Sequence, residues 1–308
     1  MDLVRLRYFI TAVECRSLAR AAEKLNVTQP ALSKSLQRLE VELGIKLLDR
    51  LPRGISPTAY GELLYSHASL INEEVLQARQ SIEAMKTGAS GKVFVGAGSS
   101  MRLHLLSRAC VALSEKSPDT EVQVVGELFD HIMPDLIQGK LDIGVSMVPQ
   151  GTTEPRLVHE PLYRDQIHPT VRVDHPLTSK EHLTARDTLG YDWILPEADN
   201  PGRQQLEAFF LAANLEPPRP KFVSDSTLFA AGVIQNSDLI GWHPTQIIGD
   251  SRLSGLVALP VPELTLTRSV GITTRRTGFL SAAARLLIEE LRKTGARMIE
   301  EKVVLPIE

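Results

Sequence analysis

The chain has 308 residues, of which 43% are hydrophobic and 23% are charged, and its formal net charge is −3. This length and composition are those of an ordinary soluble protein with two or three compact domains, which excludes a disordered chain and a membrane-spanning one. The N-terminus has no basic stretch followed by an apolar core and a cleavage site, so we expect a cytoplasmic protein without a membrane partner.

The charge is divided unevenly along the chain. Residues 1–58 hold ten Lys or Arg against six Asp or Glu, a balance of +4, whereas the remaining 250 residues hold 24 against 31, a balance of −7. A basic module on an acidic body favours a protein that approaches a polyanion with one end, although chance fluctuation can give the same pattern.

Two helical patterns joined by a short break occupy residues 17–44. The second is predicted to begin at Gln29, because Thr28 is placed to cap it and Pro30 falls in its first turn, where a backbone N–H has no intrahelical partner. Leucines then recur at a helical spacing and form one buried stripe: Leu32, Leu36, Leu39 and Leu43. Short polar and basic side chains fall on the other faces: Gln29, Ser33, Lys34, Gln37 and Arg38.

The flanks of this helix pair favour a DNA-reading module. Upstream, an apolar face can close a three-helix core: Leu6, Phe9, Ile10 and Val13. Downstream, residues 46–58 alternate and turn, which predicts a two-stranded wing whose Arg50 and Arg53 can reach phosphates or the minor groove. The exposed side chains of the second helix can read base edges in a major groove. The alternative is a small helical hairpin with a solvated face.

A seven-residue repeat of apolar side chains follows between residues 59 and 87. Its members are Leu64, Ala68, Ile71, Val75, Ala78, Ile82 and Met85. Steps of four and three residues held over three heptads are typical of a coiled-coil seam, so we expect a homodimer formed through this helix. The alternative is one amphipathic helix that packs on its own domain.

The rest of the chain alternates short apolar runs with helical patterns after a linker at 87–91. Strands are expected at 92–96, 121–125 and 142–148 and helices at 100–113 and 132–138, which is a βαβαβ unit with a parallel sheet. A second unit begins near residue 162, with apolar runs at 167–173, 192–195, 221–223 and 239–242 and helices at 204–213 and 228–235. A strand at 266–273 and a helix at 278–294 return the chain to the first unit.

The turn at residues 96–100 is a candidate ligand site. It joins the first strand to its helix, so backbone N–H groups and the hydroxyls of Ser99 and Ser100 converge where an anion such as a carboxylate is favoured. The alternative is an ordinary strand-to-helix turn in which Ser99 is the helix cap. Arg102 and Arg203 could bind a carboxylate or form surface ion pairs. Trp242 could stack on an effector or lie half-buried in the core.

The whole chain resembles the LysR-type transcriptional regulators. The residues that carry the resemblance are Leu6, Phe9, Ser17, Ala21, Ala22, Leu25, the run 28–33, Leu39, Glu40, Leu43, Gly44, Leu47, Arg50 and, further on, the sequence His175-Pro176-Leu177. Two departures are Arg16, where the family often has glycine, and Leu48, where it often has phenylalanine. If Arg16 adopts a left-handed conformation, the strain is about 1 kcal/mol.

The resemblance implies a fold of three parts. These are an all-α winged helix-turn-helix at 1–58, a linker helix at 59–87, and a two-lobed α/β effector domain of the periplasmic-binding-protein type at 92–308. Lobe I spans about 92–161 and 266–308, and lobe II spans about 162–265. The implied partners are operator DNA, a small-molecule effector and a second copy of the chain, with tetramers through the C-terminal bodies and RNA polymerase as further candidates.

The resemblance also implies the residues of two sites. The predicted DNA-binding residues are Thr28, Gln29, Pro30, Ser33, Lys34, Arg38, Arg50 and Arg53. The predicted effector-binding residues are Ser99, Ser100, Arg102, Glu127, Leu128, Met147, Pro149, Pro196, Arg203, Ser226, Thr227, Trp242 and His243.

Enzymes and solute-binding proteins are the competing classes. The chain has no nucleophile elbow, dinucleotide motif or phosphate loop, and no residues at metal-ligand spacing, so we expect no catalytic residue, metal or cofactor. The two cysteines, Cys15 and Cys110, lie far apart in apolar helical patterns and are interpreted as core residues. We therefore predict a regulator whose DNA binding or activation responds to an effector, such as a carboxylate.

Overall fold

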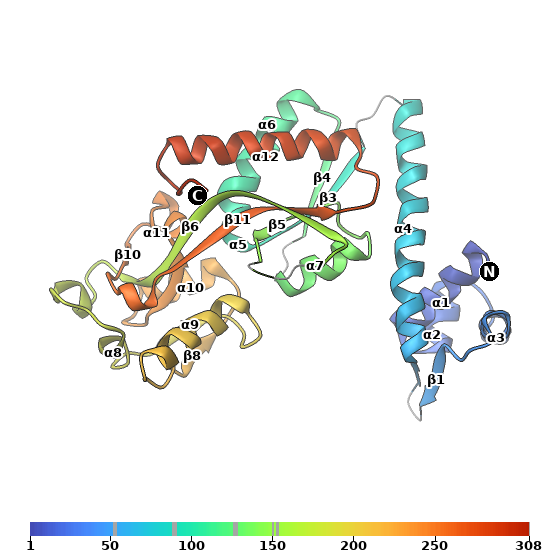
Figure 1. Ribbon diagram of the computed structural model, residues 1–308, viewed down its shortest axis with the longest axis horizontal. Coiled ribbons are helices and arrows are strands. Elements are labelled where there is room, and N and C mark those ends of the chain that lie inside the picture. The colour runs from blue at the N-terminus through green and yellow to red at the C-terminus, as the bar shows by residue number, and fades with distance from the viewer. Residues whose placement is uncertain (52–53, 88–90, 126–128, 150, 152–153, 308) are drawn as a thin grey trace.

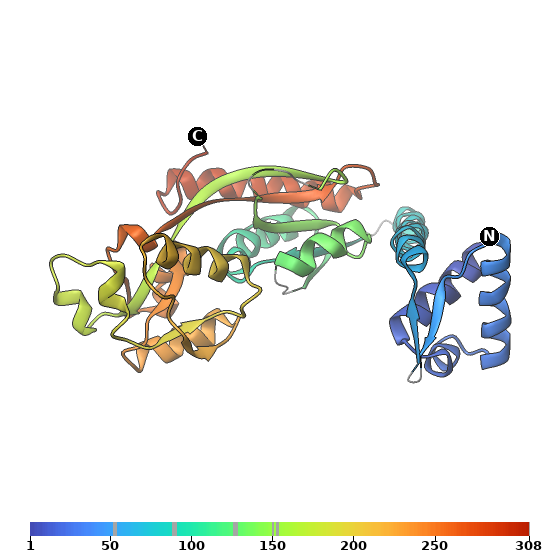
Figure 2. The same ribbon diagram turned by 60° about the horizontal axis from the view of Figure 1, so that its bottom comes forward.

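The computed structural model describes residues 1–51, 54–87, 91–125, 129–149, 151 and 154–307. Three parts follow one another along the chain: a small N-terminal module, a long helix and a larger α/β body (Figure 1). The long helix stands between the module and the body in this view and in the view turned by 60° (Figure 2). The part that is predicted to read DNA is thus separated in space from the part that is predicted to bind a ligand.

The N-terminal module consists of α1 (Leu3–Cys15), α2 (Leu18–Lys24), α3 (Gln29–Leu43) and the hairpin β1 (Leu48–Leu51) with β2 (Gly54–Pro57). The predicted start of the second helix is confirmed, since the Thr28 hydroxyl accepts a hydrogen bond from the Ala31 amide at 3.4 Å. The leucine stripe of α3 packs against Phe9, which is fully buried. Leu43 is an exception: it is 38% exposed in the last turn.

The end of α1 explains how the hairpin is attached. Arg16 adopts the left-handed conformation with a φ of 48°, which costs about 1 kcal/mol in a residue other than glycine. Its carbonyl oxygen then accepts a hydrogen bond from the Ile55 amide at 3.2 Å. A Cβ atom at Gly54 would lie 2.3 Å from the same oxygen, so the hairpin docks here because residue 54 has no side chain.

The long helix α4 spans Ala59–Thr87. Two members of the apolar repeat are used within the chain, because Ala68 is fully buried against Leu6 and Ile10 of α1, and Leu64 packs beside it. Further along the helix, Ile71 is 40% exposed and Ile82 is 54% exposed. The first third of the helix therefore packs on its own module, whereas Ile71 and Ile82 face solvent in the single chain and Val75 is half-buried. The side chain of Met85, the last member of the repeat, lies outside the described part of the structure.

A mixed sheet of seven strands forms the frame of the body. The order is β10-β6-β11-β5-β3-β4, with β9 paired to β6. The bounds are β3 Lys92–Ala97, β4 Glu121–Val125, β5 Ile143–Met147, β6 Leu157–Arg172, β9 Gly241–Pro244, β10 Leu256–Ala258 and β11 Leu266–Arg275. Strands β3, β4 and β5 pair in parallel, as the βαβαβ pattern predicts.

Helices cover both faces of the first lobe, which we define as β3, β4 and β5 with the helices that follow. On one face lie α5 (Ser99–Met101), a π-helical turn at Arg102–Leu106, α6 (Ser107–Lys116) and α12 (Ala282–Glu300). On the other face lies α7 (Phe129–Ile137). The last helix begins four residues later than predicted, because the Ser281 hydroxyl caps it at the Ala284 amide.

The second lobe has a smaller sheet and its own core. Its parallel strands are β7 (Trp193–Leu195) and β8 (Pro220–Val223), and its helices are α8 (Ala185–Thr188), α9 (Pro201–Ala212), α10 (Thr227–Gln235) and α11 (Thr245–Ile248). Short 3-10 turns lie at Pro176–Ser179, Ser251–Leu253 and Pro262–Leu264. Trp193 and Phe210 form its centre, with their rings edge to face at 5.9 Å.

Two long antiparallel strands run from one lobe to the other. The second unit was predicted to begin near residue 162, but β6 is continuous from Leu157 to Arg172 and pairs with β11 along ten residues. The register shifts between Val270 and Gly271, where the backbones approach closely. A Cβ atom at Gly271 would lie 2.1 Å from the Glu160 carbonyl oxygen. This pair of strands is the physical connection between the two lobes.

The close approach at Gly271 gives a stability prediction. We expect Gly271→Ala to destabilise the body by about 1–3 kcal/mol, because the added methyl group forces the two strands apart. Gly232 in α10 is the control: a Cβ there meets nothing within 4 Å, so Gly232→Ala should stabilise by about 0.5–1 kcal/mol. Urea unfolding of the full chain followed by tryptophan fluorescence measures both. Equal effects of the two substitutions would contradict the prediction.

Candidate functional site

The face of α3 opposite its leucine stripe is open to solvent. Thr28, Gln29, Pro30, Lys34 and Arg38 are exposed and Ser33 is half-buried. The Thr28 hydroxyl accepts a hydrogen bond from the Ala31 amide. Thr28 therefore caps the start of α3, and its hydroxyl oxygen is not free for DNA. Arg50 on β1 is also exposed, whereas the predicted wing residue Arg53 lies outside the described residues.

The cations of the N-terminal module differ in how they are paired. Arg5 and Lys24 form ion pairs with Glu42 and Glu14, and Lys46 pairs with Asp49. Within the described part of the chain, Lys34, Arg38 and Arg50 have no acidic partner.

Arg7, Arg16 and Arg20, on or beside the first two helices, also lack an acidic partner among the described residues, so the unpaired cations are spread over the module and include those of α3 and the hairpin. An unpaired cation can bind a DNA phosphate without first breaking an ion pair within the protein. This surface combines polar side chains that can read bases with cations that can neutralise a polyanion.

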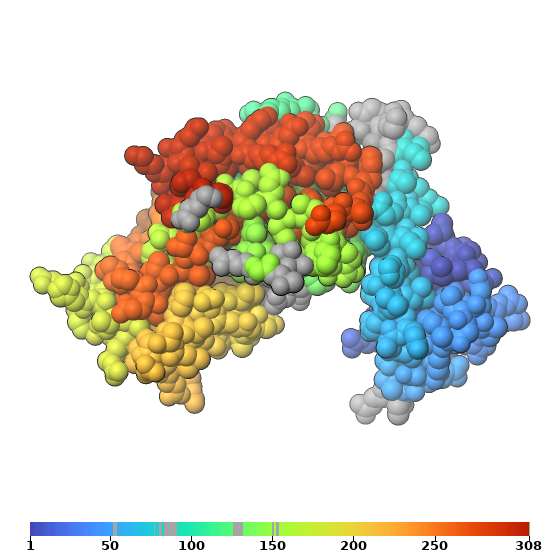
Figure 3. Space-filling model, in the orientation of Figure 1, coloured from blue at the N-terminus to red at the C-terminus, as the bar shows by residue number. Residues whose placement is uncertain are grey.

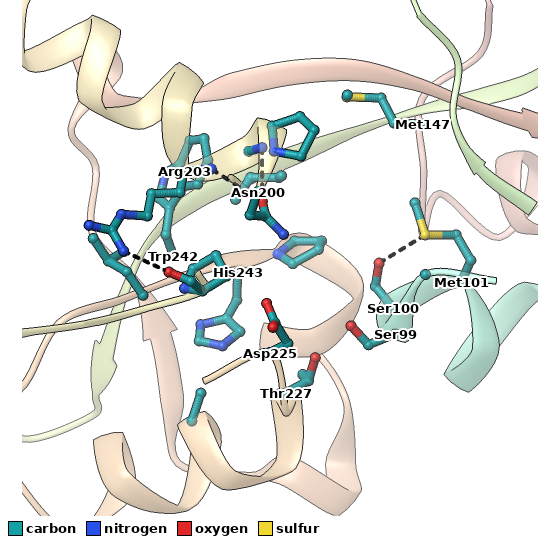
Figure 4. A pocket seen from close by; sticks show the side chains of 18 of the residues that line it. Ser99, Ser100, Met101, Met147, Asn200, Arg203, Asp225, Thr227, Trp242 and His243 are labelled. Carbon is teal, nitrogen blue, oxygen red and sulfur yellow. Dashed lines mark hydrogen bonds between the residues drawn. The ribbon is translucent and has the colours of Figure 1, made fainter. Parts of the chain in front are cut away.

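The second site is a cavity of about 250 Å³ between the lobes. Of the predicted effector-binding residues, it brings together Ser99, Ser100, Arg102, Met147, Pro196, Arg203, Ser226, Thr227, Trp242 and His243. Figure 4 shows several of these side chains around the cavity, with Met101 and Met147 on one side and Trp242 and His243 on the other. Pro149 does not line it, and Glu127 and Leu128 lie outside the described residues.

Ser99 does not cap the helix that follows it. The residue before α5 is Gly98, and no side chain makes a cap hydrogen bond there, so the interpretation of Ser99 as a cap is wrong. The Ser99 hydroxyl lines the cavity instead. The neighbouring Ser100 hydroxyl donates to the Met101 Sδ at 3.2 Å and accepts from an Arg268 Nη at 3.4 Å. The Ser99 hydroxyl makes no hydrogen bond among the described residues and can donate to a ligand oxygen, whereas the Ser100 hydroxyl can do so only by releasing the sulfur atom, a weak acceptor.

Arg268 is a cavity residue that the sequence did not predict. It lies on β11 directly opposite Asp165 on β6, and its Nε and Nη atoms bind the two Asp165 oxygens at 2.7 and 3.0 Å. Both side chains are largely enclosed, with Asp165 only 2% exposed. A bidentate pair fixes the guanidinium plane, so Arg268 presents a rigid donor to the cavity and to Ser100.

Arg203 is held by its own lobe rather than free for a ligand. Its Nε donates to Glu207 at 2.8 Å, one turn later in α9, and an Nη donates to the Pro196 carbonyl at 3.0 Å. Figure 4 shows the Arg203 guanidinium turned away from the centre of the cavity. Arg102, by contrast, is exposed and has no ion pair among the described residues.

Trp242 and His243 form the wall contributed by β9. The Trp242 indole donates to the Leu264 carbonyl at 2.8 Å and packs edge to face on Phe209, so it is half-buried as well as cavity-lining. His243 is buried, and this burial lowers its pKa to about 4. The imidazole is therefore neutral at pH 7 and adds no charge to the cavity.

Asp225 is a second cavity residue that the sequence did not predict. It precedes α10, and its carboxylate has no hydrogen bond or ion pair within the described residues. In Figure 4 its oxygens lie in the same part of the cavity as the hydroxyls of Ser99 and Thr227. No motif marks this residue, because its role depends on where the second lobe meets the first.

The long helix α4 also contacts the body. Arg275 at the end of β11 donates to the carbonyls of Leu136 and Leu141 at 2.9 and 3.0 Å, and it lies 3.6 Å from the Glu74 carboxylate on α4. The space-filling view shows α4 lying against the body (Figure 3). A Cβ atom at Gly139 would lie 3.0 Å from the Glu73 Cβ, so helix and body are in van der Waals contact there.

Metal and membrane chemistry have no support in the described parts of the chain. No group of three or more His, Cys, Asp or Glu side chains there could hold a metal ion. None of the described helices combines the length and apolarity that crossing a bilayer requires. Cys15 and Cys110 are both free and half-buried, and burial raises the pKa of the Cys110 thiol.

Comparison with known protein families covers nearly the whole chain. Residues 3–62 match the model described as "Bacterial regulatory helix-turn-helix protein, lysR family", and residues 86–296 match the "LysR substrate binding domain". The SDS degradation transcriptional activation protein of a Pseudomonas species is 30% identical over 303 residues, which are 95% of this chain and 97% of that protein. The regulator GbpR of Azospirillum brasilense is 29% identical over 241 residues, 78% of this chain and 70% of GbpR.

Solved structures give the same fold. Full-length CbnR in complex with its target DNA superposes with a TM-score of 0.65 at 19% identity and covers 96% of this chain and 100% of CbnR. Full-length OxyR C199D from Pseudomonas aeruginosa also has a TM-score of 0.65, at 22% identity, with 95% and 98% of the two chains covered. These relatives are named as regulators of transcription, so the prediction of a regulator rather than an enzyme is confirmed at the level of the family.

The buried pair behind the cavity gives a second stability prediction. We expect Asp165→Asn to destabilise the body by about 3–5 kcal/mol, because it leaves the enclosed Arg268 without its counter-charge. Replacing both residues, as Asp165→Leu with Arg268→Met, should recover most of this loss. Thermal unfolding of the full chain measures both variants. A double variant as unstable as Asp165→Asn would show that the unpaired charge is not the cause.

Proposed function

The chain belongs to the LysR family of transcriptional regulators. We propose that it binds operator DNA as a homodimer and that a small carboxylate bound between its lobes controls its effect on transcription. The family membership makes it a DNA-binding regulator with an effector-binding domain. Residues 1–58 would be the DNA-binding domain, 59–87 the dimerisation helix and 92–308 the effector domain.

The observation that carries the DNA-binding part is the solvent face of α3. Gln29 and Ser33 offer side-chain groups that match base edges, and Lys34 and Arg38 follow on the same helix as unpaired cations. A helix of this kind fits the major groove, and the hairpin with Arg50 then lies where it can reach the adjacent backbone. Lys34, Arg38 and Arg50 would position the module on phosphates, while Gln29 and Ser33 would select the sequence.

The proposed dimer rests on the later part of α4. Two members of the repeat there, Ile71 and Ile82, are exposed to solvent in the single chain. A second copy of the same helix would bury them along the seven-residue repeat. Two modules related by a two-fold axis would then read a pseudo-palindromic operator, and the second module would bind at a high effective concentration.

The proposed association of bodies into tetramers rests on a different surface. Exposed apolar side chains occur on α6 of the first lobe and on β8 and α10 of the second: Val111, Phe222, Leu228 and Phe229. Burying them between bodies of two dimers would give four modules for one regulatory region. RNA polymerase remains the proposed partner through which operator binding would affect transcription.

The proposed effector site is the inter-lobe cavity. Ser99, Ser100 and Arg268 supply hydroxyl and guanidinium donors to one part of it, which suits a carboxylate. Because its wall comes from both lobes, a ligand there would favour one arrangement of the lobes over another. Such a population shift would be transmitted to the DNA-binding modules and would alter the bend of the operator.

The role of Gln29 is tested by comparing specific with random DNA. We expect Gln29→Ala to lose about 1–3 kcal/mol of discrimination for its own promoter region, because it loses hydrogen bonds to one base. Arg50→Ala should instead weaken binding to all sequences and reduce the salt dependence. Fluorescence anisotropy at physiological salt measures both, with Gln123→Ala on the exposed face of β4 as a control without effect. Identical effects of Gln29→Ala and Arg50→Ala would contradict the assigned roles.

The dimer is tested by placing charges in the apolar seam. We expect the double variant Ile71→Glu and Ile82→Glu to lose the α4 interface and to sediment as a smaller species than the wild type. It should bind its operator about 100-fold more weakly, because the two DNA-binding modules are no longer linked. Leu211→Glu in α9 is the control, since Leu211 is 63% exposed and lies on another surface. If the double variant sediments like the control, the helix is not the dimer interface.

A further inference from the structure

The effector cavity contains one acidic side chain whose purpose the carboxylate site does not explain. Asp225 lines the cavity, is exposed to solvent, and has no hydrogen-bond or ion-pair partner among the described residues. A free carboxylate in a cavity that binds only carboxylates would repel the ligand. The presence of Asp225 therefore limits which carboxylate-containing ligands the cavity can bind.

Capping of α10 does not account for Asp225. The helix begins at Thr227, and the cap hydrogen bond comes from the Ser226 hydroxyl, which accepts from the Phe229 amide at 3.2 Å. The Ser226 amide in turn donates to the Ser224 hydroxyl at 3.2 Å. The two residues that flank Asp225 thus satisfy the backbone locally and leave both of its carboxylate oxygens free.

Arg203 and Arg268, which line the same cavity, do not neutralise Asp225 either. Arg203 is bound to Glu207, and Arg268 is bound to Asp165 through both carboxylate oxygens. His243, which lines the same cavity, is neutral at pH 7 because burial lowers its pKa to about 4. The second lobe therefore presents one uncompensated negative charge to the cavity.

The first lobe and the crossing strands present the opposite polarity. Ser99 and Ser100 offer hydroxyls, Arg268 offers a guanidinium edge that reaches Ser100 at 3.4 Å, and Arg102 is a cation without an ion pair. Figure 4 shows the Asp225 and Ser99 side chains turned toward the same space, each from its own lobe. The cavity therefore offers donors and an acceptor that face one ligand of small size.

We propose that the effector is a small α-amino acid or a similar zwitterion, whose carboxylate binds Ser99, Ser100 and Arg268 and whose ammonium group binds Asp225. This inference rests on the proposed effector site. The 250 Å³ cavity suits a ligand smaller than a typical drug-sized molecule, and Met147 and Trp242 supply apolar surface for its side chain. A plain carboxylate satisfies one half of the cavity and adds a second negative charge to the cavity that Asp225 lines, with no cation to offset it.

The test uses the full-length protein and matched ligands. We measure the Tm with each of the twenty common α-amino acids, and with the des-amino and 2-hydroxy analogues of each. We expect at least one amino acid to raise the Tm, while its analogues without the ammonium group do not, because only the ammonium group forms the charge pair with Asp225.

The variant that tests the same pair is Asp225→Asn. Titration calorimetry with the responding amino acid should show binding weaker by about 30-fold or more. Without ligand, its Tm should stay that of the wild type, since the carboxylate has no partner to lose. The control is Asp119→Asn, an exposed carboxylate of the first lobe, which should leave the affinity unchanged.

Two results would overturn the proposal. Analogues without the ammonium group that bind as tightly as the amino acid would exclude the charge pair and leave the carboxylate site in place. A panel in which no compound raises the Tm, while promoter DNA is still bound, would remove both the zwitterion and the carboxylate effector but not the DNA-binding function. Loss of promoter binding as well would contradict the proposed function itself.

Discussion

The antiparallel pairing of β6 with β11 is the constraint on which the body depends. These two strands carry the chain between the lobes, and their opposed side chains Asp165 and Arg268 form the buried pair behind the cavity. Gly271 lets their backbones approach more closely than any side chain would allow. The same ladder thus fixes the distance between the lobes and aims a guanidinium group into the space between them.

The two proposed sites use charge in opposite ways. On the N-terminal module, Lys34, Arg38 and Arg50 remain unpaired and open to water, which suits a long polyanion that arrives from solution. In the cavity, Arg203 and Arg268 are held by acids, so their charges are largely balanced before any ligand enters. The unpaired cations of the module attract DNA over a distance, whereas the paired cations of the cavity distinguish between ligands that are in contact with them.

Local patterns predicted the helices and strands well, but contacts between distant segments escaped them. Thr28 and Pro30 determine the start of α3 within three residues of sequence, and the structure confirms it. Asp165 and Arg268 lie 103 residues apart, and their pairing follows from a strand register that no single-sequence pattern contains. The repeat in α4 predicted a seam, yet Ala68 packs on α1 of its own chain, because an apolar position does not specify which surface buries it.

The contact of Arg275 with α4 has a thermodynamic consequence. One of the carbonyls that it binds belongs to Leu136 at the end of α7 and the other to Leu141 in the connection that follows, and Ile132 of α7 lines the cavity. One rigid element therefore touches both the ligand space and, through Arg275, the carboxylate of Glu74. Linkage is reciprocal: if a bound effector changes operator affinity by some factor through α7, operator occupancy must change effector affinity by the same factor. The regulator would then sense its own DNA occupancy as well as its ligand.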